Sequence, residues 1–516
     1  MLSKMPGLGR VLSQKNSHPL ADPRELRRVL AALPVDNAFK ALDEIAGWLE
    51  SLLATDECSL ERIYEAALLL DEAAQPHLHR LSREYLHTPR LTRSAEKRLW
   101  SISYGFWTLL AAVYERCLLA LDGEPGRDVE VLRSLLPNLA TRLISTLRAA
   151  LKWEQFHYGP SPAAIWLRLG KALEMAEAGG LATKMVALGA ASNWSNAQQE
   201  YLKAVAFLAA SMDSLLPAEI ELAERLIAHF LPGFVFGPVA YEDNVYWVDL
   251  KLAQAPLRLA RMPAMAAPSQ RFFKPGTAHA RMLELLHSLE RGDQIPAGLN
   301  LGDQYAVRFV LPVLRHLSAY LAPIPPQRRH DRHHVKHRMS VLSGLINAFV
   351  VFSGDFGGRP AGLQMESWVV ENVSRGGFGA LLSSIPSEWL RVGALIALQP
   401  EGGDNWLLGV VRRYHRETEN EARVGIEALS RQVMSVELKV RTISTYAAAS
   451  TVPGLLLDDG GAQDEVRVVL PPASFDLRES LEYSRGGKHF LLAPVALIEQ
   501  NGDYDLARYR RGVVGS

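Results

Sequence analysis

The polar residues with the most distinctive spacing lie between two apolar segments, in the run Asn372-Val373-Ser374-Arg375-Gly376-Gly377. On an extended chain, a carboxamide at 372 and a hydroxyl at 374 project to the same side. Asn372 and Ser374 would therefore offer hydrogen-bond donors and acceptors at one point on a sheet surface. Gly377 lets the backbone turn and lets a ligand approach closely. A plain hairpin turn uses the same residue types, so the run predicts either a turn or a binding site.

A basic arm, Gln327–Arg338, precedes this run and carries five cations against the single carboxylate of Asp331, namely Arg328, Arg329, Arg332, Lys336 and Arg338. Guanidinium groups bind phosphates and guanine edges through paired hydrogen bonds. The same composition is also typical of a solvated charged linker. Four histidines crowd the arm, but no cysteine lies nearby and the five cations oppose a metal ion, so we expect no metal site.

The first part of the chain has helical apolar spacing and must be mainly α. Proline- and glycine-rich turns separate the predicted helices, which are Leu60–Leu86, Ala95–Leu121, Val129–Leu151, Ala163–Glu177, Ala197–Ser211, Pro217–Phe230, Ala278–Leu289 and Asp303–Leu321. Trp166, Leu169 and Gly170 match the opening of a tetratricopeptide helix, although ordinary core packing explains them equally well.

After the proline-rich segment 322–326 the apolar period changes to that of strands. The predicted strands are Gly344–Phe352, Glu366–Glu371, Gly379–Leu382, Ala394–Leu398, Trp406–Arg413 and Arg423–Leu429. Six short strands at this spacing predict a small antiparallel barrel. The remaining stretch is also β-like and forms either an extension of that barrel or a second one. Ser484–Gly487 repeats the letters of Ser374–Gly377, which suggests a duplication without proving it.

Composition sets broad limits. The 516 residues are 48% hydrophobic and 22% charged, and Lys+Arg and Asp+Glu are equal at 56 each, so net charge identifies no partner. The chain is long enough for several domains. Two cysteines fit a reducing compartment, and no segment has the ~20 apolar residues of a membrane helix. We expect a cytoplasmic protein without a membrane span.

Taken together, the Arg-x-x-x-Arg arm, the Asn-x-Ser-x-x-Gly run and the six strands resemble the PilZ domain, a bacterial receptor module for cyclic di-GMP. The resemblance covers about residues 328–431. It continues in three strand-like segments, Gly393–Leu398, Leu408–Arg412 and Arg423–Glu427.

The resemblance implies a ligand held between the arm and the barrel. Arg328 and Arg332 would meet guanine edges and phosphates, Asn372 and Ser374 would bond the other side of the nucleotide, and Gly377 would permit the turn.

The spacing between the arm and the first predicted strand is longer than is usual in the family. Alignment back from that strand selects Arg338 instead, with His334 at the first arginine position. Because the charge of a histidine depends on pH, His334 would bind phosphate weakly at neutral pH. Arg338 therefore stays a candidate beside Arg328 and Arg332.

The expected fold is multidomain α + β. Its predicted parts are a flexible N-terminus (1–25), a mainly α-helical domain (26–321) with an irregular insert near 232–275, a Pro-rich linker and Arg arm (322–338), a PilZ-like six-stranded barrel (339–431) and a further C-terminal β region (432–516).

The predicted function is that of a non-enzymatic cyclic di-GMP effector without a cofactor. Ligand binding at the barrel would reorient the helical domain, which would control a protein partner. The chain lacks the nucleotide-binding and hydrolase motifs of common enzymes. One alternative is a degenerate PilZ-like adaptor that binds no nucleotide. Another is nucleic-acid binding through the arm, which the absence of an aromatic stacking platform disfavours.

Overall fold

The structure, a computed structural model, describes residues 18–514 except 89–90, 124–126, 161, 190–192, 262, 264, 303–304, 328–329, 355–364, 386–388, 404, 442–450 and 459–463. Most of the predicted flexible N-terminus (1–25) lies outside this part, because the first 17 residues are not described. The chain forms two compact units. The first comprises Met1–His157, Ser161–Met212 and Pro217–Pro326, and the second comprises Tyr158–Pro160, Asp213–Leu216 and Gln327–Ser516.

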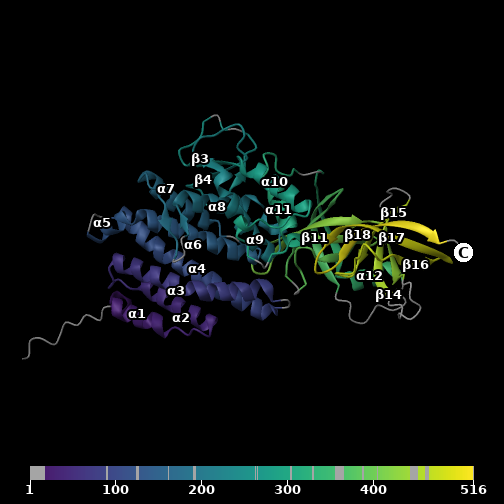
Figure 1. Cartoon of the computed structure of the whole chain (residues 1–516), viewed down its shortest axis with the longest axis horizontal. Helices are drawn as coiled ribbons and strands as arrows, with labels where there is room; N and C mark the ends of the chain where they lie inside the picture. Colours follow the sequence, from purple (N-terminus) through teal and green to yellow (C-terminus); the bar gives the residue numbers. More distant parts are fainter. Residues whose placement is uncertain are drawn as a thin grey trace, which may run out of the picture. The chain divides into compact units, whose positions relative to one another are not determined.

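The first unit is built mainly from helices, coloured purple to teal in Figure 1. Consecutive long helices pack against one another, with α4 on α2, α3 and α6, and α6 also on α7 and α8. The helices are α1 (Pro23–Ala32), α2 (Ala38–Ala54), α3 (Leu60–His87), α4 (Arg93–Leu119), α5 (Arg127–Ser134), α6 (Leu136–Phe156), α7 (Ala164–Ala178), α8 (Ala197–Ala209), α9 (Pro217–Phe230), α10 (Ala278–Glu290) and α11 (Val307–Tyr320).

Side-chain caps explain where several of these helices begin. Asn37, Ser59, Thr92 and Asn196 each accept a hydrogen bond from the backbone N–H three residues later. Such a bond satisfies one of the four N–H groups that a helix leaves without an internal partner. Proline takes the first position of α1 and α9, where its missing N–H costs nothing.

A small sheet lies where the sequence predicted an irregular insert. Its strands pair antiparallel in the order β3-β6-β4-β5. The strands are β3 (Val235–Gly237), β4 (Tyr246–Asp249), β5 (Leu257–Arg258) and β6 (Gln270–Lys274), and a separate two-stranded pair joins β1 (Val186–Ala187) to β2 (Trp194–Ser195). Short 3-10 helices complete the regular structure, at Pro19–Ala21, Ala120–Asp122, Met212–Ser214, Leu231–Gly233 and Ala297–Leu299.

The second unit contains two closed antiparallel barrels, coloured green to yellow in Figure 1. The first closes in the order β10-β11-β12-β9-β8-β7. Its strands are β7 (His333–Ser343), β8 (Glu366–Ser374), β9 (Gly377–Leu382), β10 (Leu395–Pro400), β11 (Leu407–Arg416) and β12 (Ala422–Ser430). The expected α + β architecture with a six-stranded antiparallel barrel is confirmed.

The C-terminal β region is a second closed barrel with the same connectivity. Its order is β13-β14-β15-β18-β17-β16. The strands are β13 (Val433–Val440), β14 (Thr451–Leu457), β15 (Glu465–Leu470), β16 (Leu481–Arg485), β17 (Lys488–Gln500) and β18 (Asp505–Val514). In both barrels the first three strands lie side by side in sequence order. Around the ring, the sixth, fifth and fourth strands then follow in that order. Ser484–Gly487 joins the fourth and fifth strands, whereas Ser374–Gly377 joins the second and third, so the repeated letters are not structurally equivalent.

An apolar layer joins the two barrels within the second unit. It combines outward-facing residues of the first barrel, one face of helix α12 (Leu345–Ser353) and residues of the second barrel. Its fully or nearly fully buried members include Leu342, Leu395, Val410, Leu455, Val469 and Tyr504. Because apolar area on both barrels is removed from water here, separating them would be costly.

One predicted strand is wrong. Gly344–Phe352 is not a strand, because Leu345–Ser353 forms helix α12. Leu345, Ala348 and Val351 recur every three residues and are all buried, which is a helical period hidden in a continuously apolar run. The first strand of the barrel is instead β7, which begins at His333 inside the basic arm. The single helix predicted over Val129–Leu151 is interrupted near Leu135 and forms α5 and α6.

No helix among the described residues is both long enough and apolar enough to cross a bilayer.

A close helix–strand approach in the first unit gives a testable prediction. A Cβ added to Gly170 on α7 would lie 2.0 Å from the backbone oxygen of Leu250, so Gly170→Ala should lower the free energy of unfolding by about 1–3 kcal/mol or more. Gly105 on α4 has no atom within 4 Å of the same added Cβ, so Gly105→Ala should raise stability by about 0.5–1 kcal/mol. Urea unfolding followed by far-UV circular dichroism measures both. Equal effects of the two substitutions would contradict the packing of α7.

Candidate functional site

The hairpin between β8 and β9 carries the Asn-x-Ser-x-x-Gly run. Trp368 and Val370 on β8 point into the barrel core. Simple alternation would send Asn372 and Ser374 into the core, on the side of Trp368 and Val370. However, the register of β8 against β9 shifts by one residue between Val370 and Asn372. After this bulge Val373 packs on the core, so Asn372 and Ser374 face outward. Their outward direction therefore depends on one inserted residue.

The pairing of β7 with β8 brings the arm to the same place. His333 lies opposite Val373, and His334 lies opposite Asn372. Since the strands are antiparallel, Arg332, immediately before β7, lies beside the end of β8. The ring of His330 lies over the turn, because a Cβ added to Gly376 would be 3.3 Å from its Cδ2. The arm thus passes across the hairpin.

A cavity of about 200 Å³ collects these groups. Arg332, Asn372, Ser374 and Gly377 all line it. Arg412, Arg413 and Glu427 from β11 and β12 also contribute. The lining contains three guanidinium groups and one carboxylate, and guanidinium groups can bind an anionic ligand in competition with their carboxylate partners. The amide and hydroxyl add neutral hydrogen-bonding groups that can bind a base or a phosphate.

Two glycines are required here by close packing. A Cβ on Gly377 would lie 1.9 Å from the backbone oxygen of Ile426. A Cβ on Gly379 would lie 2.5 Å from the side-chain nitrogen Nδ2 of Asn372. Gly379 is the residue opposite Asn372 in the ladder. Its missing side chain leaves the space that the carboxamide occupies. Ser374 closes the hairpin, because its Oγ donates to the Gly377 oxygen at 3.3 Å.

Arg412 links the cavity to the second barrel. Its guanidinium donates to Glu427 at 2.6 Å and to both carboxylate oxygens of Glu499 on β17 at 2.7 Å. Burial by itself raises the pKa of the Glu499 carboxyl, but the hydrogen bonds and charge of Arg412 outweigh this and lower the pKa below its ordinary value. Arg413 forms an ion pair with Asp213 at 3.9 Å, and both residues belong to the second unit.

The other predicted site residues lie elsewhere. Arg338 stands opposite Val369 on the β7–β8 ladder, and its side chain is not among the residues that line the cavity. Arg328 lies outside the described residues. The structure therefore assembles Arg332, Asn372, Ser374 and Gly377, whereas their role in ligand binding stays a prediction. Among the described residues, no three His, Cys, Asp or Glu side chains gather as metal ligands.

Sequence reasoning missed Arg412, Arg413 and Glu427. Leu408–Arg412 was recognised as a strand, but a strand period does not tell which distant hairpin its end will face. The pairing of β12 with both β9 and β11 decides this.

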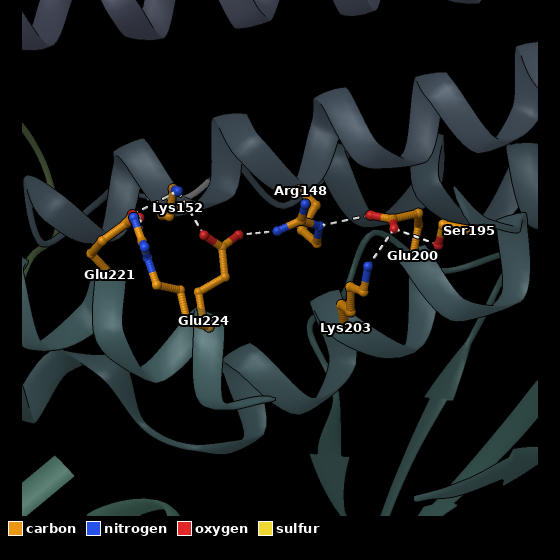
Figure 2. A network of polar contacts seen from close by, with 8 residues as sticks. Arg148, Lys152, Ser195, Glu200, Lys203, Glu221 and Glu224 are labelled. Atoms are coloured by element: carbon orange, nitrogen blue, oxygen red, sulfur yellow. Dashed lines mark hydrogen bonds and ion pairs between the residues drawn. The ribbon is translucent and has the colours of Figure 1, made fainter. Parts of the chain in front are cut away.

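The helical unit contains a second constellation of charges, drawn in Figure 2. Arg148 and Lys152 on α6 meet carboxylates on α8 and α9. Arg148 bonds Glu200 at 3.1 Å and also contacts Glu224, while Lys152 bonds Glu221 at 2.8 Å and Glu224 at 2.6 Å. Lys203 and Ser195 each bond Glu200 at 2.6 Å, and Arg225 bonds Glu221 at 3.0 Å.

Glu200 is buried, Glu221 and Glu224 are partly buried, and cations lie beside all three. Burial alone would raise the pKa of Glu200, but the charges of Arg148 and Lys203 lower it to about 2. Burial likewise would raise the pKa of Glu221, and Lys152 with Arg225 lowers it to about 2. A network whose carboxylates are satisfied internally fastens α6 to α8 and α9. We therefore interpret it as structural, and the cavity on the first barrel as the candidate site.

The network predicts a pH dependence of stability. A folded-state pKa near 2, below the ordinary value of 4.5, adds stability above pH 4.5 that is lost as the pH falls toward about 2. Glu200→Gln should lower the free energy of unfolding at neutral pH by about 3 kcal/mol and should reduce its change between pH 4.5 and 2. Chemical unfolding of both proteins at several pH values is the measurement. Glu50→Gln, on the exposed face of α2, is the control and should change neither quantity.

No curated protein matches the chain. A family match covers the mainly helical part of the chain and ends before the first barrel, so the PilZ resemblance of residues 328–431 stays a prediction. Residues 24–239 match the family model of the N-terminal domain of the cyclic-di-GMP receptor FimW, and this is the family that the helical part of the chain is similar to.

Proposed function

We propose that this protein is a non-enzymatic receptor for cyclic di-GMP and that the nucleotide binds at the cavity on the first barrel. The observation that carries the proposal is the convergence of Arg332 with Asn372 and Ser374 in one cavity. Independent support comes from the match of residues 24–239 to the N-terminal domain of a cyclic-di-GMP receptor. The two findings concern different parts of the chain and point to the same ligand.

The chemistry of the lining suits this nucleotide. Cyclic di-GMP presents two anionic phosphodiesters and two guanine bases. Arg332 can bind N7 and O6 of a guanine, or a phosphate, through two parallel hydrogen bonds. Asn372 and Ser374 can bond the remaining polar edge of the nucleotide. Arg412 and Arg413 have carboxylate partners in Glu427, Glu499 and Asp213, so a phosphate would bind these guanidinium groups in competition with those carboxylates.

The cavity is smaller than the ~300–1,000 Å³ of a typical small-molecule site. We propose that it holds one guanine and its neighbouring phosphate. The arm upstream of Arg332, including Arg328, would close over the rest of the nucleotide. A ligand held by arm and barrel together would order the junction that follows the proline-rich segment 322–326.

Ligand binding at this cavity can affect the contacts between the two barrels through Arg412. A phosphate that draws on Arg412 competes with Glu427 and Glu499, and Glu499 belongs to the second barrel. We propose that this competition, together with ordering of the arm, reorients the helical unit, which acts on a protein partner. The alternative is a PilZ-like adaptor that binds no nucleotide. Nucleic-acid binding through the arm is the third possibility.

The proposed function predicts nucleotide binding that depends on the arm and on Ser374. Cyclic di-GMP should bind the full-length protein with micromolar or tighter affinity in isothermal titration calorimetry, and GTP should not. Arg332→Ala and Ser374→Ala should each weaken binding about ten-fold or more, because each removes a direct hydrogen-bonding group. Arg338→Ala, on β7 of the same basic arm, is the matched control and should leave the affinity unchanged. Arg328→Ala tests the first arginine of the motif.

Loss of binding in Arg338→Ala alone would keep the receptor and overturn the role of Arg332. No heat and no thermal stabilisation at saturating ligand would favour the adaptor. A steep fall of affinity with salt, combined with equal binding of oligonucleotides, would favour nucleic acid.

A second prediction concerns charge in the cavity. Glu427→Gln removes the one carboxylate of the lining and one partner of Arg412, so cyclic di-GMP should bind several-fold more tightly. Glu419→Gln, in the exposed β11–β12 loop, changes the net charge equally and should leave the affinity within about two-fold, since exposed distant charges are screened. Titrations at one ionic strength make the comparison. Weaker binding in Glu427→Gln would place the phosphates away from Arg412.

A further inference from the structure

A second, larger cavity lies on the second barrel, between β13 and β16. Its volume is about 1,110 Å³, above the ~300–1,000 Å³ usual for small-molecule sites. It shares no lining residue with the cavity on the first barrel. One wall comes from Met434–Glu437 of β13 and the opposite wall from Glu482–Arg485 of β16. We call this cavity the β13–β16 groove.

The groove exists because the two strands pair only at one end. Lys439 lies opposite Glu482, and Val440 opposite Leu481, and the ladder between β13 and β16 stops there. On their other edges, β13 continues along β14 as far as Val433, and β16 continues along β17 as far as Arg485. Two facing strand edges therefore line the groove without pairing to each other.

Such edges are templates for an added strand. The backbone N–H and C=O groups of an unpaired edge can bond another extended chain. Proteins that bind peptides by strand addition obtain affinity from these backbone bonds and specificity from pockets for alternate side chains. The groove offers both, since Phe349 and Phe352 of α12 and the exposed Val513 of β18 add apolar surface to its lining.

The charges of the lining indicate which peptide would fit. Lys439, Arg485 and Lys488 are cationic, and His489 lies beside them. Of the two carboxylates, Glu482 is already bound to Arg441 at 3.3 Å, which leaves Glu437 against the three cations. The side chain of Arg485 contacts the sulfur of Met434 across the groove, so a cation stands at its open end. This arrangement is complementary to acidic side chains.

We propose that the β13–β16 groove binds an extended segment of a partner protein in which acidic and apolar side chains alternate, added as a strand between β13 and β16. Residues 442–450, which follow β13 in the chain, contain no Asp or Glu, so this segment lacks the charges that the groove would bind. This proposal goes beyond nucleotide binding and does not depend on it. It places a partner site on the second barrel as well as any on the helical unit.

The test uses the full-length protein and a fluorescein-labelled peptide of alternating Glu and Val, long enough to form a strand of about six residues. Fluorescence anisotropy should show binding of this peptide and none of the matched peptide of alternating Lys and Val. The charge-reversal variant Arg485→Glu/Lys488→Glu should weaken binding about ten-fold or more. Arg508→Glu/Arg510→Glu reverses two exposed charges of the same barrel outside the groove and should bind as the parent does.

Hydrogen exchange separates strand addition from simple charge attraction. Saturating peptide should protect backbone amides in Met434–Glu437 and Tyr483–Arg485, because added backbone bonds slow exchange there. No binding by the Glu–Val peptide, equal binding by the groove and control variants, or protection confined to other strands would overturn the proposal. Protection of these amides that rises with protein concentration in the absence of peptide would assign the groove to a second copy of this chain and overturn it too. Circular dichroism verifies that each variant is folded.

Discussion

The register of β7 against β8 is the constraint on which the candidate site depends. Antiparallel pairing of His333 with Val373 forces the residue before β7 to lie beside the end of β8. The bulge on β8 then turns Asn372 and Ser374 away from the core. A slip of one residue would exchange inner and outer faces, sending polar side chains inward and Val373 into water. Burial of Trp368, Val370 and Val373 therefore fixes the position of Arg332.

The two barrels have equal connectivity but differ in how completely their rings are paired. In the first barrel the β10–β7 closure has five paired positions, from Ser343 to Met339. In the second, the corresponding β13–β16 closure has only two. The same strand order thus carries a polar cavity on a hairpin in the first barrel. In the second barrel it leaves β13 and β16 unpaired with each other over most of their length. The cavity on the first barrel and the groove on the second arise from different local departures from the same strand order.

Charge is arranged differently in the two parts of the molecule. In the helical unit, cations from α6 and from the same helices lie beside the buried Glu200 and the partly buried Glu221, which holds the pKa values of both carboxyls near 2. In the first barrel, three guanidinium groups face a cavity that contains one carboxylate. Charges that are satisfied internally hold elements together, whereas guanidinium groups at an accessible cavity can exchange a carboxylate partner for an anionic ligand. Arg412 belongs to both kinds, because it lines the cavity and also holds Glu499.

Local sequence patterns predicted the division into a helical part and a β part, most helix positions and five of the six strands of the first barrel. They also selected Asn372, Ser374 and Gly377 as candidate site residues, but left Arg338 as a candidate beside Arg328 and Arg332. These follow from local periodicity, proline and glycine positions, and short motifs. Only packing in the folded chain showed that Leu345–Ser353 is a helix, because a short and almost entirely apolar run fits a strand as well as a helix. It also decided that Arg332 rather than Arg338 faces Ser374, that Arg412 joins the cavity and that β13 separates from β16. Each of these depends on strand register and bulges, which are set by packing between residues far apart in the chain.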